Sequence, residues 1–391
     1  MKKKLCLLAG LMLCIDSYSQ SVESLLKTVE GNNVTLAAYR KAADAAKSAN
    51  HAEVTLDDLE IGYNRLWGNP TTIGNRNDVS VSQSFDLTTL TGAKGRVAKR
   101  KDNMADNDYR IKRQDVLLEA KLCYIDAVYY NALVNELETK YSQAESIMTM
   151  QKKMLEAGEI NIIDYNNVKL SLASASTALV QAKAEREAVR AKIRQLNGGM
   201  DFEVRDSVFA PITLPESFEE WFDGVANNAP SVAMARSGVA LGKSQLALAK
   251  QSWLPKISVG YMSEKTMGEQ YQGVTLGMSV PLWSAGKKVK AAKAEASAAE
   301  ANHTAAVEEL KGELVADFAL TKGLMKAAED CRKTLRSTNN SELLQKACAT
   351  GEMSAHDYLT LMMAYYDAVE QAIQAEREAQ KAHARLTAIA L

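Results

Sequence analysis

Few residues in this sequence have the types and spacing that catalysis requires. His356 and Asp357 have the composition of an acid–base pair, but adjacent residues on a helix point in different directions. The sequence contains no nucleophile elbow, no phosphate-binding glycine loop and no zinc-binding pattern of cysteine and histidine. We therefore expect that the protein is not an enzyme and that it binds no metal ion or cofactor.

Two aspartates, Asp164 and Asp357, stand out because their surroundings match. Each lies six residues after a glycine, Gly158 or Gly351, and each is followed by a tyrosine. The glycines are suited to end a helix in the left-handed conformation. The simplest role for each aspartate is then to cap the first turn of the helix that follows.

These matching segments belong to an internal repeat. The pentapeptide Ala-Glu-Arg-Glu-Ala occurs at 184–188 and again at 375–379. Leu-Glu-Ile-Gly-Tyr at 59–63 and Ile-Ser-Val-Gly-Tyr at 257–261 both show the alternation of a strand. Because the matches keep the same order along the chain, the sequence predicts a tandem duplication.

Each copy is predicted to contain a helix, a β-hairpin, a very long helix, a tight turn and a returning helix. A helix over 92–155 would be about 95 Å long, and apolar residues spaced by three and four along it indicate a coiled coil. The predicted fold is mainly α, with long antiparallel helices and a small β part. The expected bounds are a signal peptide at 1–19, repeat 1 at 20–199 (hairpin 54–87, helices 92–155 and 161–197), a connection at 200–226, and repeat 2 at 227–391 (helices 229–253, 286–349 and 354–390, hairpin 255–282).

The composition and the first residues restrict the class of protein. Aromatic residues make up only 6% of the chain and prolines number 6, which favours long helices. The formal net charge of −1 provides no basic field for nucleic acid. Three lysines at 2–4 before an apolar stretch at 5–15 predict a secretory signal. Lipidation at Cys14 is an alternative that the bulky Leu13 disfavours.

The predicted strands alternate apolar residues with polar or small ones. Each runs for about ten residues, which is enough to cross a bilayer when tilted, although a half-buried sheet in a soluble protein shows the same alternation. Four strands cannot close a barrel, and an open edge is excluded in lipid. Two copies would supply eight strands and three would supply twelve. Aromatic residues flank both ends, as expected of membrane interfaces: Trp253 and Trp283 at one end, and Tyr63, Trp67, Tyr261 and Tyr271 at the other.

The end of the last predicted strand, Gly277-Met278-Ser279-Val280-Pro281-Leu282, and the Gly-Lys-Lys at 286–288 resemble the TolC outer-membrane efflux family. The signal peptide and the tandem repeat are similar to that family as well, over about 25–391. The resemblance implies a homotrimer, with a twelve-stranded transmembrane β-barrel that continues into a helical barrel in the periplasm. It implies the outer membrane channel of a tripartite efflux system. The expected partners are a periplasmic adaptor, an inner-membrane transporter of the resistance–nodulation–division (RND) type and outer membrane lipid, with no nucleic acid.

The resemblance also assigns roles to single residues. It places Asp164 and Asp357 at the periplasmic constriction, where three-fold symmetry would form rings of carboxylates that select cations. Thr360 stands where the family has a further acidic residue, so these rings would carry less charge. The tips that contact the adaptor would contain Gly158, Glu159, Gly351 and Glu352.

Two questions stay open. A soluble periplasmic coiled-coil adaptor or scaffold protein would share the helical pattern, although such proteins contain one helical hairpin joined to β-rich domains. The exported substrate could be metal ions, drugs or another class. The run Pro255–Tyr261 and the short length are more similar to the heavy-metal cation efflux branch.

Overall fold

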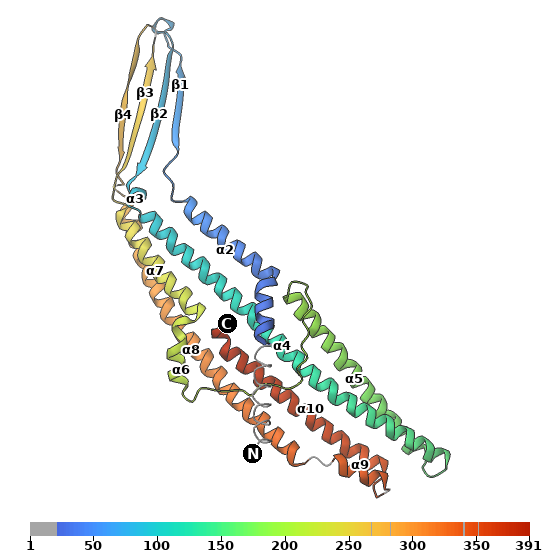
Figure 1. Ribbon diagram of the computed structural model, residues 1–391. Coiled ribbons are helices and arrows are strands. Elements are labelled where there is room, and N and C mark those ends of the chain that lie inside the picture. The colour runs from blue at the N-terminus through green and yellow to red at the C-terminus, as the bar shows by residue number, and fades with distance from the viewer. Residues whose placement is uncertain (1–21, 267, 282, 339–340, 351) are drawn as a thin grey trace, which may run out of the picture. The chain divides into compact units, whose positions relative to one another are not determined.

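The computed structural model describes residues 22–391 except 267, 282, 339–340 and 351. The predicted signal peptide at 1–19, and Cys14 with it, lies outside the described residues. The structure is mainly helical with a small β part, as the sequence predicts (Figure 1). Residues 22–32 are helical, and they are followed by α2 (Val34–Ala52), β1 (Leu59–Leu66), a short η1 (Thr71–Ile73), β2 (Arg76–Asp86), α3 (Leu87–Leu90), α4 (Ala93–Glu156), α5 (Ile162–Leu196), α6 (Phe218–Val225), η2 (Ala226–Asn228), α7 (Pro230–Gln251), β3 (Lys256–Lys265), β4 (Gln270–Ser279), α8 (Ala285–Ser337), α9 (Ser341–Ala349), α10 (Ala355–Leu386) and η3 (Thr387–Ala390).

The long helices of the two repeats differ. α4 runs unbroken for 64 residues, whereas α8 ends at Ser337 and α9 begins at Ser341. The single helix predicted at 286–349 is therefore wrong. At the end of α8, Ser337 Oγ and Thr338 Oγ1 both donate to the carbonyl of Thr334.

The described residues form two compact units. The first, called the helical unit below, contains the residues up to Ala37 together with Lys112–Val225 and Lys311–Leu391. The second, called the sheet unit, contains Ala38–Ile111 and Ala226–Leu310. α4 and α8 each contribute residues to both units. Each unit therefore draws on both predicted repeats.

The sheet unit contains one antiparallel sheet in the order β1-β2-β3-β4. The pairing of β2 with β3 joins the hairpin of the first repeat to that of the second (Figure 1). The register places Ile61, Val81, Tyr261 and Val274 in one row across the four strands. Since side chains alternate between faces along a strand, this row fixes the face of every other residue in the sheet.

Helices of the sheet unit pack through polar pairs and small residues. His51 Nε2 of α2 lies 2.7 Å from Asp102 Oδ2 of α4. α7 approaches α8 closely at Gly242, where an added Cβ would lie 3.1 Å from Ala296 Cα. A larger residue at this position would push the two helices apart.

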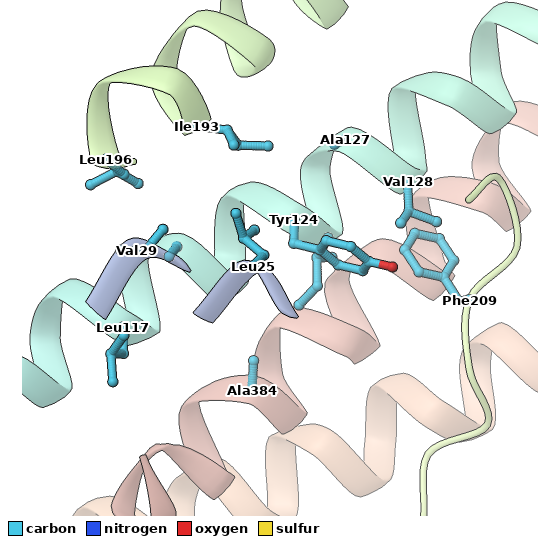
Figure 2. Packing of buried hydrophobic residues seen from close by; sticks show 12 residues of the cluster. Leu25, Val29, Leu117, Tyr124, Ala127, Val128, Ile193, Leu196, Phe209 and Ala384 are labelled. Carbon is cyan, nitrogen blue, oxygen red and sulfur yellow. The ribbon is translucent and has the colours of Figure 1, made fainter. Parts of the chain in front are cut away.

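The helical unit has a continuous apolar core. Tyr124 of α4 is fully buried, and its hydroxyl donates to Asp206 in the connection between the repeats. Packing of this kind, more than helix propensity, stabilises helices in proteins. The surrounding side chains come from the N-terminal helix, α4, α5, α10 and the connection, and those labelled in Figure 2 are Leu25, Val29, Leu117, Ala127, Val128, Ile193, Leu196, Phe209 and Ala384.

Candidate functional site

One face of the sheet, called the apolar face below, carries large apolar side chains that are exposed. Ile61, Val274 and Leu276 are 71%, 73% and 78% exposed. Contiguous apolar surface of this kind marks contact with a membrane or another protein. The register places the following residues on the same face: Leu59, Tyr63, Val79, Val81, Phe85, Ile257, Val259, Tyr261 and Met278.

The opposite face, called the polar face, carries small and polar residues. A Cβ on Gly260 would lie 2.7 Å from both Thr275 Oγ1 and the carbonyl oxygen of Val81. Only glycine fits at this position without movement of the sheet. The polar face is therefore suited to contact water, and its members include Gly62, Ser80, Ser82, Ser84, Ser258, Gly273, Thr275 and Gly277.

Charged residues on the polar face gather near the loops that connect the strands of each hairpin. Asp78 and Glu264 lie directly opposite each other on β2 and β3. Arg76 bridges them, with Nε 2.8 Å from Asp78 Oδ1 and Nη2 2.9 Å from Glu264 Oε2. The arginine offsets the repulsion that two like charges directly opposite would cause.

The aromatic residues predicted at membrane interfaces lie near both ends of the sheet. Trp253 and Trp283 flank the end where Lys256 pairs with Ser279, and their side chains are 54% and 85% exposed. At the loop end, Tyr63 lies on the apolar face and Trp67, which is 76% exposed, directly follows β1.

Two of the predicted interface residues differ from this arrangement, Tyr261 in its position along the strand and Tyr271 in the face that it occupies. Tyr261 is in the middle of β3, in the same row as Ile61 and Val274, and not at the loop end. Tyr271 lies on the polar face opposite Glu264, and its hydroxyl donates to Glu269 Oε2 at 2.8 Å. Tyr261 therefore belongs to the middle of the apolar face, and Tyr271 belongs to the polar face.

β1 and β4 form the edges of the sheet. Within the described residues, β1 pairs only with β2, and β4 pairs only with β3. Each edge strand therefore has a row of backbone N–H and C=O groups along its outer side that the sheet does not pair. Such edges are templates for pairing with another chain.

The turn after α4 holds the first aspartate. Gly158 has a φ of 76°, and the Glu159 N–H donates to the Met154 carbonyl, which is the hydrogen bond of a Schellman ending. Asn161 precedes α5, and its side chain accepts from the Asp164 N–H at 2.9 Å and donates to Asp164 Oδ2 at 2.8 Å. Asn161 therefore caps α5, and a side-chain hydrogen bond also links its amide group to the Asp164 carboxylate.

The turn before α10 has the same arrangement. Ser354 Oγ accepts from the Asp357 N–H at 3.1 Å and donates to Asp357 Oδ2 at 2.7 Å. The N-caps are therefore Asn161 and Ser354, and the aspartates are their partners one turn later, which corrects the interpretation that the aspartates themselves are the caps. Glu159 and Glu352 are exposed beside these turns, and the predicted tip residue Gly351 lies outside the described residues.

An apolar cluster lies behind the two turns. It combines Ile147 of α4 and Val168 of α5 with Tyr358, Leu359 and Met362 of α10. Val168 follows Asp164 by one helical turn and Tyr358 follows Asp357 directly. The structure therefore brings both aspartates to the same end of the helical unit.

The helical unit also contains a polar network that was not among the predicted sites. Asp126 of α4 accepts from Arg377 Nε at 2.6 Å and lies 2.7 Å from Lys381 Nζ. The Arg377 guanidinium lies 4.7 Å from the centre of the Tyr129 ring, a cation–π contact. Burial disfavours the charged guanidinium, but the hydrogen bond to Asp126 and the negative charges of Asp126 and Glu378 nearby together raise the pKa of Arg377. Arg377 lies in the repeated pentapeptide at 375–379. The repetition of this pentapeptide is the sequence feature from which Arg377 could have been identified.

In the part of the chain that the structure describes, no helix is both long enough and apolar enough to span a membrane. The same residues include no group of three or more His, Cys, Asp or Glu side chains placed to hold a metal ion.

The sequence of the second repeat matches a known family. The model of a family described as outer membrane efflux protein matches residues 221–390. For these residues, the resemblance predicted from the motifs at 277–288 is thereby confirmed. A comparison of the sequence with curated proteins finds no match.

Solved structures share the fold over nearly the whole chain. CusC, whose structures concern folding and transmembrane channel formation, matches with a TM-score of 0.77 and 13% identity, covering 95% of this chain and 92% of that one. The Campylobacter jejuni CmeC outer membrane channel matches with a TM-score of 0.74 and 15% identity, covering 95% and 85%. The open state of the Neisseria gonorrhoeae MtrE outer membrane channel gives 0.74 and 14%, covering 94% and 88%. At these identities the matches establish the fold.

Proposed function

We propose, on the basis of the match of residues 221–390 to the outer membrane efflux protein family, that this chain is the outer membrane channel of a tripartite efflux system. The observation that carries the proposal is the sheet, which has an exposed apolar face, a polar face and two open edges. Open edges are not tolerated in lipid. Three copies would close them into one barrel with a lumen.

The two faces of the sheet indicate which side of the proposed barrel would contact lipid and which would line the lumen. The apolar face would contact lipid and the polar face would line the lumen, which is the alternation of membrane barrels with a water-filled interior. Tyr63, Trp67, Trp253 and Trp283 would lie at the two interfaces, where aromatic side chains are enriched. Tyr261 and Tyr271 are not part of this assignment.

We assign the periplasmic constriction to Asp164 and Asp357. Both lie at the start of helices that pack at one end of the helical unit. In a trimer, each would occur three times around the axis, and rings of carboxylates favour cations. The side chains of the N-cap residues Asn161 and Ser354 donate to Oδ2 of each carboxylate. The same aspartates would therefore both fix the ends of the helices and set the selectivity.

The partners follow from the proposed place in the efflux system. The turns at Gly158, Glu159, Gly351 and Glu352 would contact a periplasmic adaptor, and an RND-type inner-membrane transporter would supply the energy. The channel itself would conduct passively in the outer membrane, reached through the signal peptide, and would catalyse no reaction. The run Pro255–Tyr261 is similar to the heavy-metal cation efflux branch, and this similarity favours metal cations as the substrate class. A soluble adaptor is not favoured, because its sheet would not leave an apolar face exposed.

The native molar mass of the protein extracted by neutral detergent from outer membranes tests the channel proposal. We expect particles with three chains, found in the outer membrane fraction. A single chain per particle, or protein recovered in the soluble periplasmic extract, would mean that the sheet does not form a shared barrel.

Conductance of single trimers in planar bilayers tests the constriction. Asp164→Asn with Asp357→Asn removes the charges but keeps an oxygen that can accept from each cap. We expect the preference for cations over anions to fall. The matched control, Asn161→Ala with Ser354→Ala, removes the caps and keeps the carboxylates. Unchanged selectivity in the Asp→Asn variant would overturn the assignment.

A further inference from the structure

A cavity in the helical unit lies beneath the connection between the repeats. It measures about 550 Å³ and lies between α8, α10 and residues 209–212, within the size range of sites for small molecules. Phe209, Ala328 and Ala379 form an apolar floor and are 8%, 7% and 2% exposed. The cavity thus combines a buried apolar base with an opening at the surface.

The wall formed by the connection is held in place. The carbonyl of Ala210 accepts a hydrogen bond from Gln380 Nε2 of α10. Phe209, the preceding residue, is part of the buried core around Tyr124 (Figure 2). A site whose walls are fixed by the fold loses little conformational entropy when a ligand binds.

The rim of the cavity has an excess of positive charge. α8 supplies Arg332, Lys333 and Arg336, together with Glu329, and α10 supplies Glu376. Arg332 is engaged by Glu376, with Nε 2.7 Å from Oε1. Lys333 and Arg336 are both exposed, and no carboxylate of the described residues forms an ion pair with either. Two cationic groups are therefore available to a ligand.

The first repeat has a smaller cavity in the related place, and its charges balance. It measures about 200 Å³ and lies beneath residues 202–204, between α4 and α5. Arg186 and Arg190 line it together with Glu187 and Glu203. An apolar floor with a surplus of cations is therefore a property of the second-repeat cavity.

We propose that the cavity beneath residues 209–212 binds an organic anion with an apolar body, such as an aromatic sulfonate or a long-chain carboxylate. The body would rest on Phe209, Ala328 and Ala379, and the anionic group would meet Lys333 and Arg336. Guanidinium groups bind such anions through two parallel hydrogen bonds. The site does not depend on the channel function, because all of its residues belong to one chain and one unit.

A pair of fluorescent probes with the same aromatic body tests this site. Anilinonaphthalene sulfonate carries the anionic group and phenylnaphthylamine lacks it. Both would be titrated into the full-length protein in lipid nanodiscs, with empty nanodiscs as the blank. We expect saturable binding of the sulfonate, one molecule per chain, at least about tenfold tighter than binding of the uncharged probe.

Charge reversal locates the site. Lys333→Glu with Arg336→Glu should weaken sulfonate binding by about tenfold or more and leave the uncharged probe unaffected. Lys322→Glu with Lys326→Glu, on exposed positions of α8 outside the cavity, makes the same change in net charge and should have no effect. A second variant, Ala210→Trp, narrows the cavity and should weaken both probes.

Three results would overturn the proposal. These are equal affinity for the two probes, equal loss in the two charge-reversed variants, and unchanged binding in Ala210→Trp. Molar mass and circular dichroism of every variant would be compared with the wild type, so that loss of binding is separated from loss of folding.

Discussion

The sheet and the helical unit use apolar residues in opposite ways. Leu276 of β4 is 78% exposed, whereas Leu25 in the helical core is fully buried. The helical unit makes its own core, so its apolar residues leave water when the chain folds. The apolar face of the sheet leaves water only when something else covers it. The two regions should therefore respond to mutation through different quantities, packing in one and transfer from water to lipid in the other.

The largest expected effect is a charge on the apolar face. Leu276→Arg should block assembly in the outer membrane, because an arginine facing lipid near the middle of a barrel costs about 2–4 kcal/mol in each copy. The measure is the amount of trimer in the outer membrane fraction. Thr275→Arg, one residue earlier on the polar face, is the control and should be tolerated. Equal loss in both variants would contradict the assignment of the two faces.

Truncation of the helical core should have the next largest effect. Leu25→Ala should lower the stability by about 2–5 kcal/mol, because the removed side chain leaves a cavity in close-packed surroundings. Val208→Ala, at a position 70% exposed, should change it by less than about 0.5 kcal/mol. Chemical denaturation of the purified protein distinguishes the two variants. A similar decrease in the free energy of unfolding in both variants would mean that the core around Tyr124 contributes little to stability.

Removal of the helix caps should have a smaller effect. Asn161→Ala and Ser354→Ala should each cost about 0.5–2 kcal/mol, since each leaves a backbone N–H without its partner. The expected readout is faster backbone hydrogen exchange confined to the first turns of α5 and α10. Exchange that rises equally in the sheet would show that the helix ends are not local features.

The smallest expected effect is a dependence on pH in the helical unit. Burial, and then the Lys121 ammonium nearby, lower the pKa of His383 below its ordinary value. The folded state therefore favours the neutral ring. This contribution is complete above the unfolded pKa, near 6.5, and is lost as the pH falls towards the folded pKa. We expect melting temperature to fall from pH 7.5 to 5.5, and to fall less in His383→Gln. An identical fall in the variant would assign the effect to other groups.

The faces of the sheet could be predicted from the sequence, including the face on which Tyr271 lies. Counting by twos from Val274 places Tyr271 with Gly273 and Thr275, on the polar face that the structure confirms. The position of Tyr261 along its strand could not be read in this way, because it depends on how far the pairing of β3 continues towards Lys265. Alternation fixes the face of a residue, whereas the length of the pairing fixes its depth.

Some helix ends could be predicted from the sequence, and others could not. The glycine at 158 marks the end of α4, since a left-handed residue is needed there. The end of α8 at Ser337 has no glycine or proline to mark it, so the sequence pattern gives no signal for a helix end there. The cavity beneath residues 209–212 depends on contacts between segments distant in sequence, such as Gln380 with Ala210. No local pattern indicates such a contact.

The open edges at β1 and β4 have a genetic consequence. In the proposed trimer, every chain supplies one edge to each neighbour. A chain whose β4 edge cannot pair therefore prevents closure of the barrel that it joins. If variant and wild-type chains are made in equal amounts and mix at random, only about one eighth of the trimers are free of the variant. Such an allele should be dominant over the wild-type gene, whereas a deletion of the gene should be recessive.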